Sequence, residues 1–165
     1  MTNFSTKALI IAFTFFFSSA VLAIQNQYSV GYGPLQIFNK DAYSLAPIWL
    51  LGWLTLLLST FVIGVFFALK QVIARWVVVV FIVSMTSGRL IFDFLNLPFL
   101  GGSIAIMHII FWSPLLILLS RCYFDKNKPM SFRVWVTCLS IFIITSLFFD
   151  IRDALIYIEH IQSLS

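Results

Sequence analysis

Residues 45–69 read LAPIWLLGWLTLLLSTFVIGVFFAL, an apolar run of 25 residues without a charged side chain. A helix rises about 1.5 Å per residue, so a helix of this length exceeds the ~30 Å hydrocarbon core of a bilayer. Within lipid the backbone N–H and C=O groups need partners in the segment itself, and a single helix supplies them. The run therefore predicts a membrane-spanning helix.

Four further apolar stretches of similar length lie on either side of this run. They cover residues 8–24, 76–95, 104–120 and 134–151. Short connections between successive helices favour antiparallel neighbours. We therefore expect an all-α integral membrane protein, a bundle of about five transmembrane helices that forms one domain over residues 1–165.

The composition agrees with a membrane protein. The chain is 61% hydrophobic and 10% charged, whereas soluble domains are about 45–50% apolar and about 25% charged. The net charge of +4 does not indicate nucleic acid as a partner, because the basic residues stand singly at the ends of the apolar runs. The lipid bilayer is the partner that this pattern predicts.

The basic residues also predict an orientation. Seven of them fall in segments that alternating spans place on one side: Lys7, Lys70, Arg75, Arg121, Lys126, Lys128 and Arg133. The other side keeps Lys40 and Arg152. The positive-inside rule then predicts a cytoplasmic N-terminus and a C-terminus outside. No glycosylation sequon falls in a predicted outer loop, which favours a bacterial-type inner (plasma) membrane.

The two ends of the chain leave alternatives open. Residues 1–23 also resemble a signal peptide with a small-residue cleavage site, and cleavage would leave four spans in the same orientation. Residues 152–165 alternate apolar and polar side chains at near-helical spacing. We expect them to extend the last helix outward or to lie as an amphipathic helix on the outer surface. They can dock on the loop of residues 25–47 or on a partner.

Six ionisable residues fall within or at the end of the predicted spans, where charge is rare. They are Arg89, Asp93, His108, Asp150, Arg152 and Asp153. A charge at the bilayer centre costs at least about 2.5–3.5 kcal/mol, so such residues usually face the bundle interior and pair. Counted along each helix from the nearest basic anchor, Arg89, His108 and Asp150 lie about 20–25 Å deep. Three helices thus place charge at a common level.

Their spacing allows pairing. Arg89 and Asp93 are four residues apart and share one helix face, as do Asp150 and Asp153 at a spacing of three. Arg89 can bridge the two carboxylates of this second face. The cluster is either a structural clamp between helices, a pair that docks a partner, or an outward-facing polar site.

No catalytic signature accompanies the cluster. The HExxH, GxSxG, Walker and GxGxxG patterns do not occur in the sequence, and these mark common hydrolases and nucleotide-binding proteins. His160 lies about 20 Å above His108 along the predicted helices, which disfavours a haem with two histidine ligands. We predict no cofactor and no metal.

The main functional hypothesis is an accessory, scaffold or assembly subunit that works with another membrane protein or a second copy, and is not an enzyme. The alternative is a transporter, proton relay or membrane enzyme with an outward-facing polar site, built from Arg89, Asp93, His108, Asp150 and Asp153. In that alternative, Arg89 holds an anionic group while His108 and a carboxylate exchange protons.

Overall fold

The computed structural model describes residues 27–123, 125 and 127–164, and this part of the chain is helical. The helices are α2 (Ala42–Leu45), α3 (Ile48–Ala68), α4 (Val72–Phe94), α5 (Gly101–Tyr123) and α6 (Met130–Leu164). The described residues contain no strand, only an isolated β-bridge between Val30 and Ile37. The all-α fold class is confirmed.

Four of these helices, α3 to α6, are long and apolar enough to cross a membrane. The expected membrane-type helical bundle is therefore confirmed for this part of the chain, while the predicted span 8–24 lies outside the described residues. The observed helices differ from the predicted stretches mainly at their ends. α4 begins four residues earlier, at Val72, and α6 runs without interruption through residues 134–151 and the expected extension.

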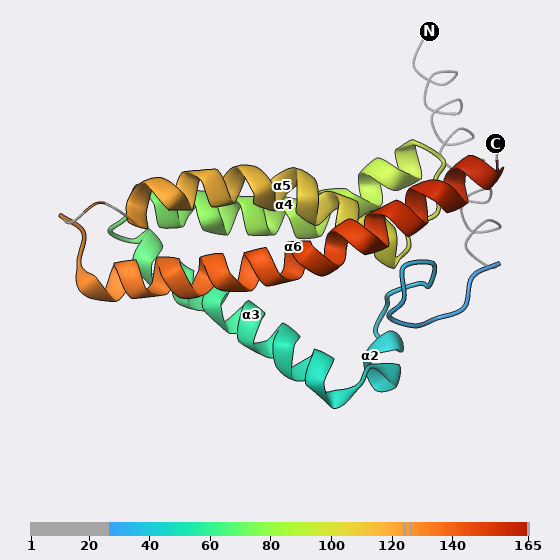
Figure 1. The fold of residues 1–165 in the computed structure, drawn as a ribbon, viewed down its shortest axis with the longest axis horizontal. Helices are drawn as coiled ribbons and strands as arrows, with labels where there is room; N and C mark the ends of the chain where they lie inside the picture. Colours follow the sequence, from blue (N-terminus) through green and yellow to red (C-terminus); the bar gives the residue numbers. More distant parts are fainter. Residues whose placement is uncertain (1–26, 124, 126, 165) are drawn as a thin grey trace, which may run out of the picture.

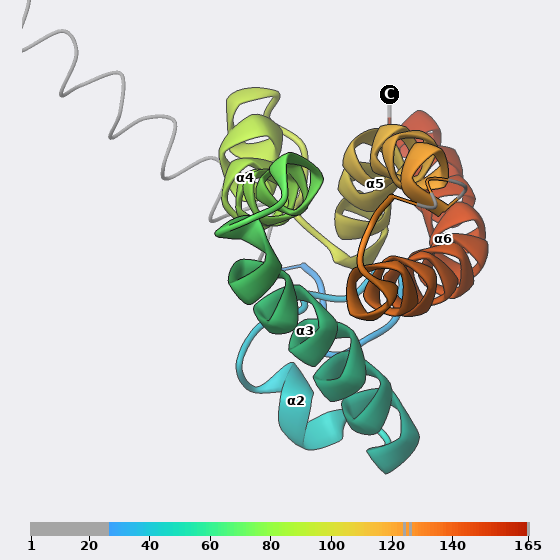
Figure 2. The ribbon, with the colours of Figure 1, turned by 90° about the vertical axis from the view of Figure 1, so that its left-hand side faces the viewer.

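The helices α4, α5 and α6 run alongside one another, and α3 crosses obliquely beneath them (Figure 1). Seen along the bundle, α5 lies between α4 and α6 (Figure 2). The most extensive packing is between α5 and α6, followed by α3 on α4 and α4 on α5. The interface between α5 and α6 therefore dominates the arrangement.

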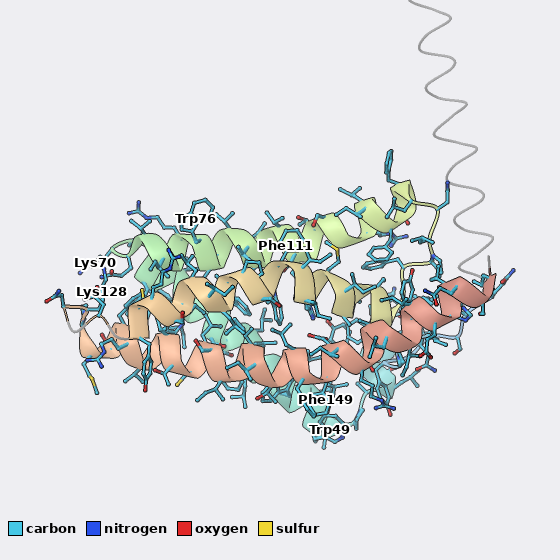
Figure 3. The ribbon with its side chains drawn as sticks, turned by 45° about the horizontal axis from the view of Figure 1, so that its top comes forward. Trp49, Lys70, Trp76, Phe111, Lys128 and Phe149 are labelled. Atoms are coloured by element: carbon cyan, nitrogen blue, oxygen red, sulfur yellow. The ribbon has the colours of Figure 1, made fainter. Side chains whose placement is uncertain are left out.

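One end of the bundle collects the basic side chains, and we call it the basic end. It is defined by Lys70, Arg75, Arg121, Lys128 and Arg133; Figure 3 shows Lys70 and Lys128 there together. The turn between α3 and α4 is held at this end, because the Arg75 Nε atom donates to the carbonyl oxygen of Ala68 at 2.8 Å. The Lys128 ammonium donates to the Gln71 side chain at 3.1 Å, which ties the two loops together.

The larger core fills the half of the bundle nearest the basic end. Phe61, Trp112, Trp135 and Leu139 are buried there among residues of all four long helices. The indole Nε1 of Trp135 donates to the backbone carbonyl of Thr60 at 2.9 Å. This hydrogen bond fixes α6 against α3 in a region where lipid offers no partner for a polar group.

A smaller core lies towards the C-terminus of α6. Its buried members are Phe92, Leu100, Met107 and Tyr157, and side chains of the segment 28–37 pack against it. The 35 residues of α6 span about 52 Å, while about 20 residues suffice to cross a bilayer. Of the alternatives for residues 152–165, the structure therefore has a continuation of the last helix, packed on the loop that precedes α2.

Candidate functional site

His108 on α5 and Asp150 on α6 form the central pair of the candidate site. The His108 Nδ1 atom lies 3.1 Å from the Asp150 Oδ2 atom, and each side chain is 14% exposed. One turn earlier on α6, the Ser146 hydroxyl donates to the same carboxylate oxygen at 3.3 Å. The main helix interface therefore contains a largely buried acid–base pair, held by side chains 42 residues apart.

The imidazole of His108 is also held by an aromatic ring. It stacks on Trp112, one turn further along α5, with ring centroids 3.9 Å apart and an angle of 15° between the planes. The Trp112 indole donates to the Ser84 hydroxyl on α4 at 3.3 Å. Contacts therefore run from α6 through His108 to α4, and they leave the imidazole little freedom to rotate.

The second imidazole nitrogen of His108 differs from the first, because no residue of the described chain bonds to it. The Nε2 atom of His108 is buried and makes no hydrogen bond within the part of the chain that the structure describes. An imidazole whose Nδ1–H is held by a carboxylate presents Nε2 as a proton acceptor. A buried polar atom without a partner is costly, about 1–3 kcal/mol. This nitrogen is therefore the atom of the site with unused chemistry.

Arg89 and Asp93 form a second, separate pair on α4. The Arg89 Nε atom lies 3.7 Å from the Asp93 Oδ2 atom, with the side chains 64% and 34% exposed. The other carboxylate oxygen of Asp93 is buried and has no hydrogen-bond partner among the described residues. The two residues share the helix face that their spacing predicts, and that face lies at the bundle surface.

The two remaining candidates take no part in either pair. Arg152 is exposed and Asp153 is half-buried, and neither side chain forms an ion pair within residues 27–123, 125 and 127–164. Arg89 does not bridge Asp150 and Asp153. The six candidate residues thus divide into a buried pair, a surface pair and two single residues. The sequence places them at one level without deciding which face each one occupies.

Two hydrogen bonds near the C-terminus of α6 were not expected from the sequence. The Tyr157 hydroxyl, almost fully buried, donates to the backbone carbonyl of Pro98 at 2.8 Å. Tyr28 and His160 share a hydrogen bond of 2.8 Å, and burial raises the pKa of Tyr28 above its usual value, which keeps the phenol protonated. The loop between α4 and α5 is therefore attached to α6, beside the smaller core.

The start of α5 is held by the loop before α2. The amide of Gly101 donates to the carbonyl of Gln36 at 2.9 Å, and the amide of Gly102 donates to the carbonyl of Pro34 at 2.8 Å. The first amides of a helix have no partner within the helix, so these carbonyls replace a capping side chain. The loop of residues 27–41 is thus part of the support of the site.

Replacement of Tyr157 by phenylalanine tests this support. The change leaves the buried Pro98 carbonyl without its donor, so we expect the folded state in detergent to lose about 1–3 kcal/mol. Thermal unfolding of the purified protein measures the loss. Tyr43→Phe is the matched control, because the Tyr43 ring is 49% exposed, and it should unfold as the wild type does. Equal unfolding of both variants would contradict the role of the hydroxyl.

Known proteins offer no guide to this site. No family model, no curated protein and no solved structure matches the chain. No group of three or more histidine, cysteine or acidic side chains within the described residues is placed to hold a metal ion. The geometry alone therefore defines the site. It is a buried His–Asp pair within a helical bundle of membrane type, with a separate ion pair at the bundle surface.

Proposed function

We propose that the chain is a small polytopic membrane protein that works as an accessory, scaffold or assembly subunit of a membrane complex. The observation that carries this proposal is the Arg89–Asp93 pair on the exposed face of α4. Charged residues within membranes usually both pair and face the bundle interior, and here the pair forms but the arginine side chain is 64% exposed. A partner protein with polar groups at the same level supplies the missing cover.

The surroundings of the pair favour a protein partner. One turn before Arg89 the surface is apolar, with Met85 51% exposed, and Phe94, which follows Asp93, is 81% exposed. Asp93 keeps one buried oxygen without a donor among the described residues, and a hydrogen-bond donor from a helix of the partner would satisfy it. Polar side chains hydrogen-bond across helix interfaces in membranes, so this mixed surface suits a helix of a second protein or of a second copy.

We place the protein in the inner (plasma) membrane with its basic end in the cytoplasm. The charge distribution supports this orientation, since Lys70, Arg121 and Arg133 lie at the end opposite to the C-terminus of α6. The positive-inside rule assigns such an end to the cytoplasm. This orientation puts the C-terminus outside and, with the predicted span of residues 8–24, the N-terminus in the cytoplasm.

The test is recovery of the complex from native membranes in mild detergent, followed by mass spectrometry. The Arg89→Gln/Asp93→Asn double variant removes both charges and keeps the side-chain shapes. We expect recovery of a stoichiometric partner with the wild type and a roughly tenfold or greater loss with the double variant, equivalent to about 1.4 kcal/mol. Arg152→Gln is the control, because Arg152 is exposed and unpaired within the described residues, and it should retain the partner.

Two results would contradict the proposal. A wild-type protein that is recovered alone and is fully functional alone has no need of a partner. Equal recovery of the partner with the wild type and with the double variant would remove the observation on which the proposal rests.

A second candidate function is a proton relay, and the unpartnered Nε2 atom of His108 favours it. Asp150 orients the imidazole and stabilises its protonated form, while Nε2 takes up and releases the proton. In this function the Arg89–Asp93 pair is structural. The test is replacement of Asp150 by asparagine, which removes the charge and keeps the shape.

A further inference from the structure

A groove between α5 and α6 opens on the surface of the bundle at the basic end. Two hollows that share Tyr123 form it. The hollow nearer the end is lined by Tyr123, Met130, Arg133, Val134, Thr137 and Cys138. The hollow further along is lined by Leu116, Leu119, Ser120, Tyr123, Ser140 and Ile144. Small side chains at positions 120, 137, 138 and 140 leave this space between two closely packed helices.

Among the described residues that line the groove, Arg133 has a buried side-chain nitrogen that makes no hydrogen bond, and this group is charged. The Nε atom of Arg133 is buried and has no hydrogen-bond partner among the described residues. A buried cationic donor without a partner is unfavourable, so an acceptor from outside the described chain would be bound strongly. The planar guanidinium, with its fork of donors, fits the oxygens of a phosphate group.

The rest of the groove is mostly apolar, with the hydroxyl groups of Ser120, Thr137 and Ser140 among its lining, and it runs away from Arg133 along both helices. From Arg133 to Ile144 the rise of α6 is about 16 Å, close to half of the ~30 Å hydrocarbon core. Arg133 is the fourth residue of α6, so its guanidinium lies near the end of the helix, where lipid headgroups meet water. The order of the groups, cationic and then apolar over one leaflet, matches a phospholipid.

The charge around the groove has the sign that an anionic lipid requires. Arg121 is exposed at the end of α5 beside Tyr123, and the Lys128 ammonium lies in the adjoining loop. Basic pockets between transmembrane helices bind the headgroups of anionic lipids. We propose that the groove between α5 and α6 is a binding site for one anionic phospholipid, with its phosphate on Arg133 and an acyl chain along Leu116 and Ile144.

Cys138 provides a reporter for this site. It is exposed and lines the groove, whereas Cys122 is buried and serves as an internal control. The full chain in mild detergent receives either phosphatidylglycerol or phosphatidylcholine with the same acyl chains, and alkylation of each thiol by a maleimide is followed by mass spectrometry. At ten times its dissociation constant, the anionic lipid is expected to slow alkylation of Cys138 about tenfold, and the zwitterionic lipid is expected to leave it nearly unchanged.

Two variants separate the site from general surface charge. Arg133→Gln is expected to weaken protection by phosphatidylglycerol tenfold or more, as hydrogen bonds to charged groups imply. Lys70→Gln removes one charge from the same end without touching the groove, and it should keep full protection. Native mass spectrometry should find one phosphatidylglycerol per chain in the wild type and in Lys70→Gln.

The comparison of the two lipids on the wild type stands even if Arg133→Gln does not fold. Equal protection by both lipids overturns the proposal, because the phosphate site would then have no role in selection. Unchanged protection in a folded Arg133→Gln protein overturns it as well. So does a groove occupied by polypeptide, which would appear as a crosslink from Cys138 to residues 1–26 or to another protein.

Discussion

Replacement of Gly102 by leucine is expected to prevent α5 and α6 from closing, and to yield protein that does not survive extraction as a folded bundle. A side chain at this position would meet the Cβ atom of Tyr157 and, at 2.7 Å, the backbone carbonyl oxygen of Asp153. Backbone on the partner helix cannot move aside as a side chain can. We therefore expect the upper end of the usual cost of overpacking, about 3 kcal/mol or more.

Gly52→Leu is the matched control. Gly52 lies in α3, and a side chain there would meet nothing within 4 Å. Leucine has a higher helix propensity than glycine, by up to about 1 kcal/mol, so this variant should be as stable as the wild type or slightly more stable. Thermal unfolding and size-exclusion chromatography in detergent measure both variants. A folded Gly102→Leu protein with an unchanged transition would show that the two helices are not in close contact at this position.

The helical bundle was predictable because long apolar runs in a chain of this composition can form few structures other than helices. The run of residues 45–69 contains the whole of α3, and the helix begins at Ile48 because Pro47 is extended and precedes its first turn. The start of α4 was less predictable. Arg75 lies inside the helix although it is charged, because its side chain reaches back to the carbonyl of Ala68 at the end of α3.

Pairs within one helix follow from spacing alone, and pairs between helices do not. The Arg89–Asp93 contact needs only the four-residue repeat of α4. The contact of His108 with Asp150 depends on how α6 is rotated against α5, and the two helices also pack closely at Gly102 and Tyr157. The spacing along each helix predicts a depth for each charge. It does not say whether Asp150 or Asp153 faces the imidazole.

The contacts that α6 makes with the loop before α2 were the hardest to predict from the sequence. Tyr28 and His160 are 132 residues apart, and no periodic pattern relates a loop residue to a helix residue at that distance. The amphipathic spacing of residues 152–165 shows that one face is covered, but it does not identify the cover. Here it is the loop itself, through side chains such as Leu35 and Ile37 in the smaller core.

Replacement of Asp150 by asparagine is expected to abolish proton transfer while the bundle stays assembled, if the His108–Asp150 pair is a relay. The amide oxygen still accepts hydrogen bonds from the His108 Nδ1–H group and from the Ser146 hydroxyl, so the geometry is kept. The carboxylate charge that stabilises the protonated imidazole is lost. Positioned acid–base groups contribute about 10²–10⁴-fold to proton transfer, so the loss should fall in this range.

Proton flux into vesicles that carry the reconstituted protein and a trapped pH-sensitive dye measures the effect. Asp153→Asn is the control, because Asp153 is a half-buried carboxylate of the same helix without an ion pair in the described chain, and its flux should equal that of the wild type.

A loss of stability without a loss of flux would contradict the relay. If Asp150→Asn lowers the unfolding temperature while flux per folded molecule is unchanged, the pair is a clamp between α5 and α6. The accessory function then stands without the relay, since a clamp needs the hydrogen bond and the charge of Asp150 only for stability.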